Sequence, residues 1–217
     1  MKIFSPLLAC VVVLGCSGRA LSTEYLSNLS ESTSGTLVVD GSRKVAQSFW
    51  SGSGSYSLIS IILLMSPESA NSDPLHVSLF SSSGEEVGSW LGDLGTGDPY
   101  SSAGGQHTWT PGASINLSSN TKYWIVLDTT ESEHGYAWNY TSSMSASSED
   151  GWSIPATNTY AVDTGSGWNY SDGRPQQIAV TASVVPEPGS VFLVSAGVLV
   201  CLAVVRLWRR QADAAPL

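Results

Sequence analysis

Cysteine is missing from the central part of this 217-residue chain. The three cysteines are Cys10, Cys16 and Cys201, and all of them lie close to an end. Residues 23–185 therefore contain no disulfide and no thiolate metal site. A segment of this length can bury enough apolar surface to form a core without cross-links.

Basic residues are also scarce. Residues 23–185 hold 16 acidic side chains against four basic ones, Arg43, Lys44, Lys122 and Arg174, for a net charge of −12. Such a surface repels phosphate backbones. We therefore expect no nucleic-acid partner.

Helical periodicity is nearly absent from the same segment. Short apolar or alternating runs recur instead, separated by turns rich in glycine, serine and Asp-Pro. These features predict an all-β fold, an antiparallel β-sandwich of jelly-roll-like type. The expected strands are residues 37–40, 45–50, 58–65, 75–80, 86–91, 107–110, 122–128, 136–140 and 176–183.

Three segments carry more specific expectations. The run LISIILLM, residues 58–65, is predicted to be a central strand buried on both faces. The run YWIVLD alternates, with Tyr123, Ile125 and Leu127 on one side and Trp124, Val126 and Asp128 on the other. Residues 144–172 are so rich in turn formers that the sequence leaves open whether all of them are ordered.

The two ends are typical of targeting segments. Residues 1–22 combine Lys2, an apolar run and small residues in the order of a secretory signal peptide, so the mature chain is expected to begin at Thr23. Signal peptidase would then be a processing partner. A second interpretation is a lipoprotein site, with Cys16 lipidated after cleavage.

Near the other end, residues 191–208 are long and apolar enough to predict a short single transmembrane helix. The basic cluster that follows predicts a cytoplasmic C-terminus, residues 211–217, with the body outside. Before the helix, two prolines hold the chain in an extended conformation. The proline segment is Pro186, Glu187 and Pro188, and the basic cluster is Arg206, Arg209 and Arg210.

The order of Val185-Pro186-Glu187-Pro188, apolar span and arginine cluster resembles the PEP-CTERM sorting signal, here residues 185–210. The resemblance implies an exosortase as partner and a membrane-anchored precursor. After processing, the body would reach the cell surface or extracellular matrix of a Gram-negative-type bacterium that makes exopolysaccharide or a biofilm. The alternative is a plain C-terminal membrane anchor.

The body, residues 23–184, is predicted to be the extracellular domain, and its stretch from Val45 to about Tyr140 resembles the extracellular "choice-of-anchor" domains. The resemblance implies a surface module without assigned enzymatic activity, whose ligand is not known. It rests on the segments VAQSF at 45–49, LISIILLMS at 58–66, LHVSLFSSSGE at 75–85, LSSNTKYWIVLD at 117–128 and YAWNY at 136–140.

No catalytic motif stands out, so we predict no catalytic residue, no cofactor and no metal site. The histidines lack ligand or triad spacing, the acidic clusters fall in turns, and no G-x-S-x-G elbow occurs. A calcium site at Asp93 and Asp98 and a secreted hydrolase are kept as alternatives. The histidines and acidic residues considered for a catalytic or metal-binding role are His76, His107, His134, Glu85, Glu86, Glu131, Glu133, Glu149 and Asp150.

Aromatic residues are abundant, with seven tryptophans and eight tyrosines in residues 23–185, and Trp-Asn-Tyr occurs twice. Aromatic faces flanked by amides and hydroxyls are suited to stacking on sugar rings, although core packing and cross-strand pairing are the more common roles of such residues. The leading hypothesis is a noncatalytic exported protein, and a carbohydrate-binding module is the alternative, with exopolysaccharide as the ligand. The candidate glycan-binding residues are Trp138, Tyr140, Trp168, Asn169 and Tyr170.

Overall fold

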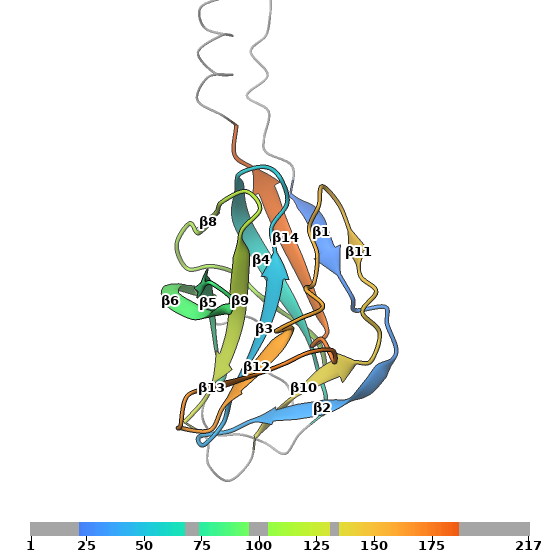
Figure 1. Cartoon of the computed structure of the whole chain (residues 1–217), viewed down its shortest axis with the longest axis vertical. Helices are drawn as coiled ribbons and strands as arrows, with labels where there is room; N and C mark the ends of the chain where they lie inside the picture. The colour runs from blue at the N-terminus through green and yellow to red at the C-terminus, as the bar shows by residue number, and fades with distance from the viewer. Residues whose placement is uncertain (1–21, 68–73, 96–103, 131–134, 187–217) are drawn as a thin grey trace, which may run out of the picture. The chain divides into compact units, whose positions relative to one another are not determined.

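The structure is a computed structural model that describes residues 22–67, 74–95, 104–130 and 135–186. Over these ranges the chain forms fourteen β-strands and no helix, and all the strand pairs are antiparallel (Figure 1). The strands belong to two sheets that face each other across a shared core. The predicted all-β antiparallel sandwich is confirmed.

The larger sheet has the order β11-β1-β14-β4-β10-β2, and β7 and β8 pair with β4 as well. Its strands are β1 (Thr23–Ser27), β2 (Thr33–Val39), β4 (Tyr56–Met65), β7 (Gly105–Trp109), β8 (Asn116–Leu117), β10 (Tyr136–Thr141), β11 (Ser147–Ser148) and β14 (Ile178–Val184). The last strand, β14, lies inside this sheet between β1 and β4.

The smaller sheet has the order β13-β12-β3-β9-β5-β6. Its strands are β3 (Lys44–Trp50), β5 (His76–Ser83), β6 (Glu86–Asp93), β9 (Lys122–Asp128), β12 (Tyr160–Asp163) and β13 (Trp168–Ser171). Its two edges are therefore β13 and β6, which are far apart in the sequence.

The core between the sheets is apolar and aromatic. Strand β9 contributes Tyr123, Ile125 and Leu127 from the smaller sheet, and β4 contributes Ile61 and Leu63 from the larger one. Neighbouring residues of a strand point to opposite faces, so the core takes alternate residues of each strand. The alternation predicted for YWIVLD is confirmed.

The prediction that residues 58–65 are buried on both faces is wrong. Strand β4 is central, but Ile59 is 39% exposed, and Ile62 and Leu64 are only partly buried. The pairing of β4 with β14 shifts between Ser60 and Leu58, which is a β-bulge at Ile59. Since the bulge resets the alternation, one face of β4 supplies the core and the other remains partly accessible.

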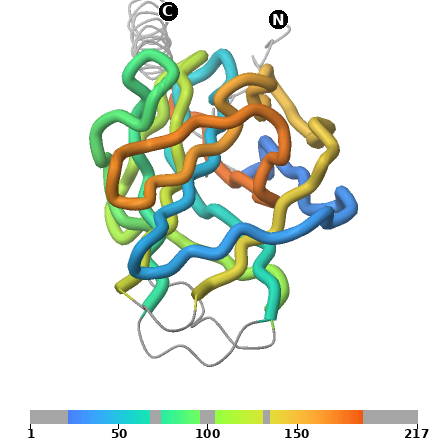
Figure 2. Tube along the Cα trace, turned by 60° about the horizontal axis from the view of Figure 1, so that its bottom comes forward, coloured from blue at the N-terminus to red at the C-terminus, as the bar shows by residue number. Residues whose placement is uncertain are grey.

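The segment left open by the sequence, residues 144–172, is ordered and contains β11, β12 and β13. Trp152 anchors it because this side chain is buried against Tyr25, Phe49 and Tyr56. The β12 and β13 hairpin extends the smaller sheet, and Figure 2 shows this orange hairpin lying over blue and green segments.

No helix capable of crossing a bilayer occurs within the described ranges. The predicted signal peptide, residues 1–22, and the predicted transmembrane helix, residues 191–208, fall outside those ranges apart from residue 22. The same holds for the predicted sorting-motif residues Glu187, Pro188, Arg206, Arg209 and Arg210 and for the alternative of a lipidated Cys16.

Candidate functional site

A second hydrophobic cluster covers the outer face of the smaller sheet, away from the inter-sheet core. Trp124 and Val126 point to this face because their neighbours along β9 point inward. We name it the outer aromatic cluster. It consists of Ala46, Trp124, Val126 and Ala161, with Phe80, Val87, Trp168 and Tyr170 packed against them.

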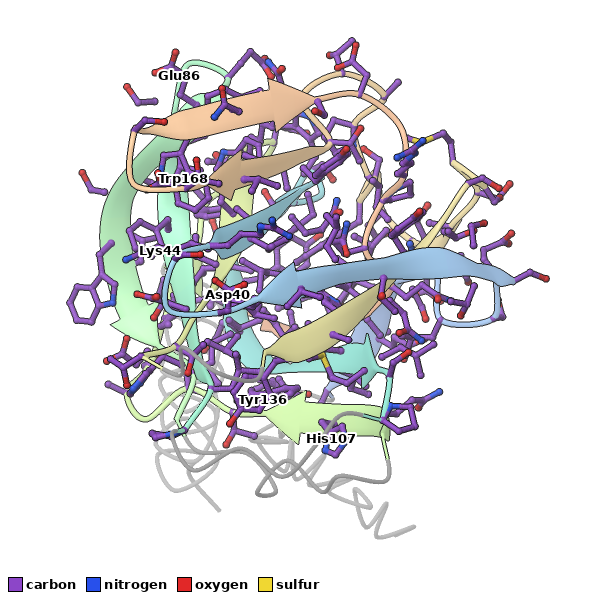
Figure 3. The ribbon with its side chains drawn as sticks, turned by 90° about the horizontal axis from the view of Figure 1, so that it is seen from below. Asp40, Lys44, Glu86, His107, Tyr136 and Trp168 are labelled. Atoms are coloured by element: carbon purple, nitrogen blue, oxygen red, sulfur yellow. The ribbon has the colours of Figure 1, made fainter. Side chains whose placement is uncertain are left out.

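The two edges of the smaller sheet come together over this cluster. Tyr170 of β13 accepts a hydrogen bond at its hydroxyl from the backbone N–H of Val87 of β6, at 2.9 Å. Its ring meets Trp124 edge to face, with centroids 5.6 Å apart, so Trp124 is fully buried although it faces outward. Glu86 at the start of β6 and Trp168 at the start of β13 are seen on the same side of the molecule in Figure 3.

Burial raises the pKa of Tyr170 above the ordinary tyrosine value, and the nearby Glu86 carboxylate raises it further. The hydrogen bond from Val87 acts in the opposite direction. The phenol is therefore neutral at physiological pH, and its main role in this geometry is to hold β13 against β6.

An ion pair between the buried Lys122 and the exposed Glu85 lies at one side of the cluster. The Lys122 side chain is 1% exposed, and its Nζ lies 2.6 Å from Oε2 of Glu85 and 5.0 Å from the centre of the Trp124 ring. Glu85 belongs to the turn between β5 and β6, so the pair ties that turn to β9. A second pair, Lys44 with Asp128 at 2.7 Å, is exposed.

The structure separates the two Trp-Asn-Tyr copies. Trp138, in β10 of the larger sheet, is 0% exposed and donates its Nε1–H to the Gln177 carbonyl at 3.3 Å. It has no ring face open to a ligand. Trp168 and Tyr170 lie in β13 of the smaller sheet, half-buried, with Asn169 exposed between them.

Tyr140 is also half-buried, at the opposite end of β10 from Tyr136. Its ring lies against the backbone of Gly35, where an added Cβ would be 2.6 Å from the tyrosine oxygen. The Arg174 guanidinium lies 5.8 Å from the same ring. The five predicted binding residues therefore divide between two sheets, and the copy in β13 is the one on the outer aromatic cluster.

Sequence reasoning missed Trp90. At 56% exposure this β6 residue is the most exposed tryptophan among those the structure describes. Its Nε1–H donates to Oδ1 of Asp93 at 3.0 Å, and the Ser78 hydroxyl donates to the same oxygen at 2.7 Å. Both hydrogen bonds lower the pKa of the Asp93 carboxyl, and the bond from the Ser78 hydroxyl has the larger effect. A tryptophan among glycine, serine and aspartate in GSWLGD was the available signal.

The histidines and acidic clusters that the structure describes do not converge. His76 is exposed at the start of β5 and pairs across the sheet with Asp128, while His107 is buried beside Trp109. Glu149 and Asp150 are exposed in a turn. No group of three metal-ligating side chains occurs in the described part of the chain. Glu131, Glu133, His134 and Asp98 lie outside it.

No protein-family model matches this chain, and no curated protein matches it significantly.

Proposed function

We propose that this chain is a noncatalytic exported protein of the cell surface or extracellular matrix, processed at both ends. An exosortase would act at the Pro-Glu-Pro tail, and signal peptidase would remove residues 1–22. The support for the tail is the order of Pro186-Glu187-Pro188, apolar span and arginine cluster, which resembles the PEP-CTERM signal. The body would then associate with exopolysaccharide outside the cell.

The limits of the folded body support processing at these places. Strand β1 begins at Thr23, and β14 ends at Val184. The last backbone hydrogen bond of the body runs from the N–H of Val185 to the Ser55 carbonyl, at 2.9 Å. Cleavage next to Pro186 would therefore leave all fourteen described strands in place, including β14, which lies inside the larger sheet between β1 and β4.

The finer fold assignment, a jelly-roll-like sandwich, belongs to the same proposal. The chain alternates between the sheets through β2, β3, β4 and β5 before it forms the β5 and β6 hairpin. Repeated crossing of this kind is typical of jelly rolls. A signal peptide and one transmembrane helix, residues 191–208, complete the proposed precursor.

The test is the intact mass of the protein recovered separately from the membrane, the outer surface and the medium. We expect a species that starts at Thr23 and ends near Pro186, outside the inner membrane. Replacement of Pro186-Glu187-Pro188 by alanines should leave an unprocessed membrane form, whereas alanines at Gln211 and Asp213 should not. A wild-type chain that retains Leu217 and occurs only in the membrane would make the tail an ordinary anchor.

Carbohydrate binding is the second candidate function, and the outer aromatic cluster is the observation that favours it. Half-buried Trp168 combines one packed side with an accessible one, and exposed Asn169 supplies polar groups beside it. Sugar recognition needs this combination of apolar ring face and hydrogen-bonding groups. Retention in an affinity gel, lost on Trp168→Ala, is the expected result. Equal migration in gels with and without glycan would refute it.

A further inference from the structure

Trp90 is held in a fixed orientation while its ring remains accessible. The Nε1–H bond to Asp93 fastens one edge of the indole, yet the side chain is 56% exposed. A tryptophan that is already ordered loses little conformational freedom when a ligand stacks on it. An exposed aromatic ring with one polar edge tied down is therefore a suitable platform for the apolar face of a sugar.

Asp93 places hydrogen-bonding capacity beside this platform. Both Trp90 and Ser78 use the oxygen Oδ1, so neither bond occupies Oδ2. An ionised carboxylate accepts strong hydrogen bonds from sugar hydroxyls. The carboxylate also repels anionic ligands, and the net charge of −12 over residues 23–185 adds to that repulsion.

The surroundings of Trp90 are poorly suited to a protein partner that would add a strand to this edge. The pairing of β6 with β5 shifts twice, between Leu79 and Phe80 and between Phe80 and Ser82. Such bulges interrupt the ladder that an incoming strand would need. Apart from Leu91, which is 39% exposed, the flanking residues Gly88, Ser89 and Gly92 offer little apolar area for a hydrophobic interface.

We propose that Trp90, Asp93 and Ser78 form a subsite for one sugar ring of an uncharged polysaccharide built of gluco-configured pyranoses. A pyranose with equatorial hydroxyls presents C–H groups on its face, which would stack on Trp90. Its hydroxyls at the ring edge would donate to Asp93. This inference rests on the proposed carbohydrate binding and adds a residue, Trp90, that the Trp-Asn-Tyr pattern does not contain.

The experiment uses the full-length protein in a nonionic detergent without a sugar headgroup, titrated with cellohexaose and with laminarihexaose. Binding is measured by calorimetry and by protection of tryptophan fluorescence from acrylamide quenching. For whichever hexaose binds the wild-type protein, Trp90→Ala should raise the Kd by about tenfold or more, because it removes the stacking surface. Leu91→Ala, which changes the adjacent residue of 39% exposure, is the matched control and should bind like wild type.

A second variant tests the electrostatic part. Asp93→Asn retains an oxygen that can accept from Trp90 but removes the charge. The measured quantity is the ratio of the affinity for the neutral hexaose to the affinity for an alginate oligomer of equal length. We expect Asp93→Asn to lower this ratio. An unchanged preference would refute the role assigned to Asp93.

The remaining outcomes separate this subsite from the wider proposal. If the wild-type protein binds, Trp90→Ala binds equally well and Trp168→Ala does not, the Trp90 subsite is refuted and carbohydrate binding stands. If the wild-type protein binds neither hexaose, both fail. If sedimentation shows a wild-type dimer that Trp90→Ala dissociates, the platform serves self-association and the subsite is refuted.

Discussion

Replacement of Trp152 by alanine tests whether residues 144–172 are an integral part of the fold. The Trp152 ring is 1% exposed and stacks on Tyr25 at 5.3 Å and on Phe49 at 5.9 Å, with Tyr56 edge-on at 5.0 Å. Truncation of a buried tryptophan to alanine costs about 3–5 kcal/mol through lost burial and the cavity that remains.

One feature of the same side chain reduces this cost. Its Nε1–H is buried without a hydrogen-bond partner among the described residues, and an unsatisfied buried donor costs about 1–3 kcal/mol. Since alanine removes that donor too, we expect a net loss of about 3 kcal/mol. In a domain of this size the loss corresponds to a fall in Tm of about 6–12 °C.

The assay is thermal and urea unfolding followed by circular dichroism, with two comparison variants. Trp152→Phe retains an aromatic ring and removes the unsatisfied donor, so it should cost about 1 kcal/mol. Trp90→Ala makes the same change at an exposed site and should stay within about 0.5 kcal/mol of wild type. Equal Tm values for Trp152→Ala and Trp90→Ala would refute the packing of residues 144–172 against the core.

Two further predictions concern the outer aromatic cluster. Glu85→Ala should destabilise the protein by about 1 kcal/mol because it leaves the buried Lys122 ammonium uncompensated. The same substitution should have almost no effect on stability in a Lys122→Met background. The free energies of unfolding come from urea denaturation of the double-mutant cycle, and additive effects of the two substitutions would contradict the coupling. Because burial raises the pKa of Tyr170, its stabilising contribution is present below the ordinary value of 10.0 and is lost as pH rises above it. Tyr170→Phe should therefore lose less stability than wild type between about pH 9 and pH 11, and identical pH profiles would argue against this assignment.

The sequence predicts the strands whose apolar residues alternate clearly, and misses those that depend on partners. The alternation predicts a strand at residues 122–128, and the structure has β9 at Lys122–Asp128. Strands β12 and β13 lie among glycine, serine and aspartate, so their local pattern is weak. They form because β12 pairs with β3, and because the loop before them is tied down by Trp152.

The bulge in β4 could not be read from LISIILLM either. Eight consecutive apolar or small residues carry no mark that shows where the alternation changes phase. The phase is set by the pairing with β14, in which Ser60 faces Thr181 and Leu58 faces Ala182. A long-range contact therefore decides which residues of this strand remain partly exposed.

The two Trp-Asn-Tyr copies show the same limit for the candidate site. In a strand, the spacing within Trp-Asn-Tyr places the tryptophan and the tyrosine on the same face, but it does not determine whether that face is buried. In β10, next to β4 and β2, that face is the inter-sheet core, and Trp138 is buried. In β13, at the edge of the smaller sheet, it is the outer face, where Tyr170 is half-buried. The position of a strand at the edge of a sheet therefore determines which aromatic residues are available to a ligand, and only the assembled sheet defines that position. The same reasoning identifies Trp90 on β6, the other edge strand of the smaller sheet.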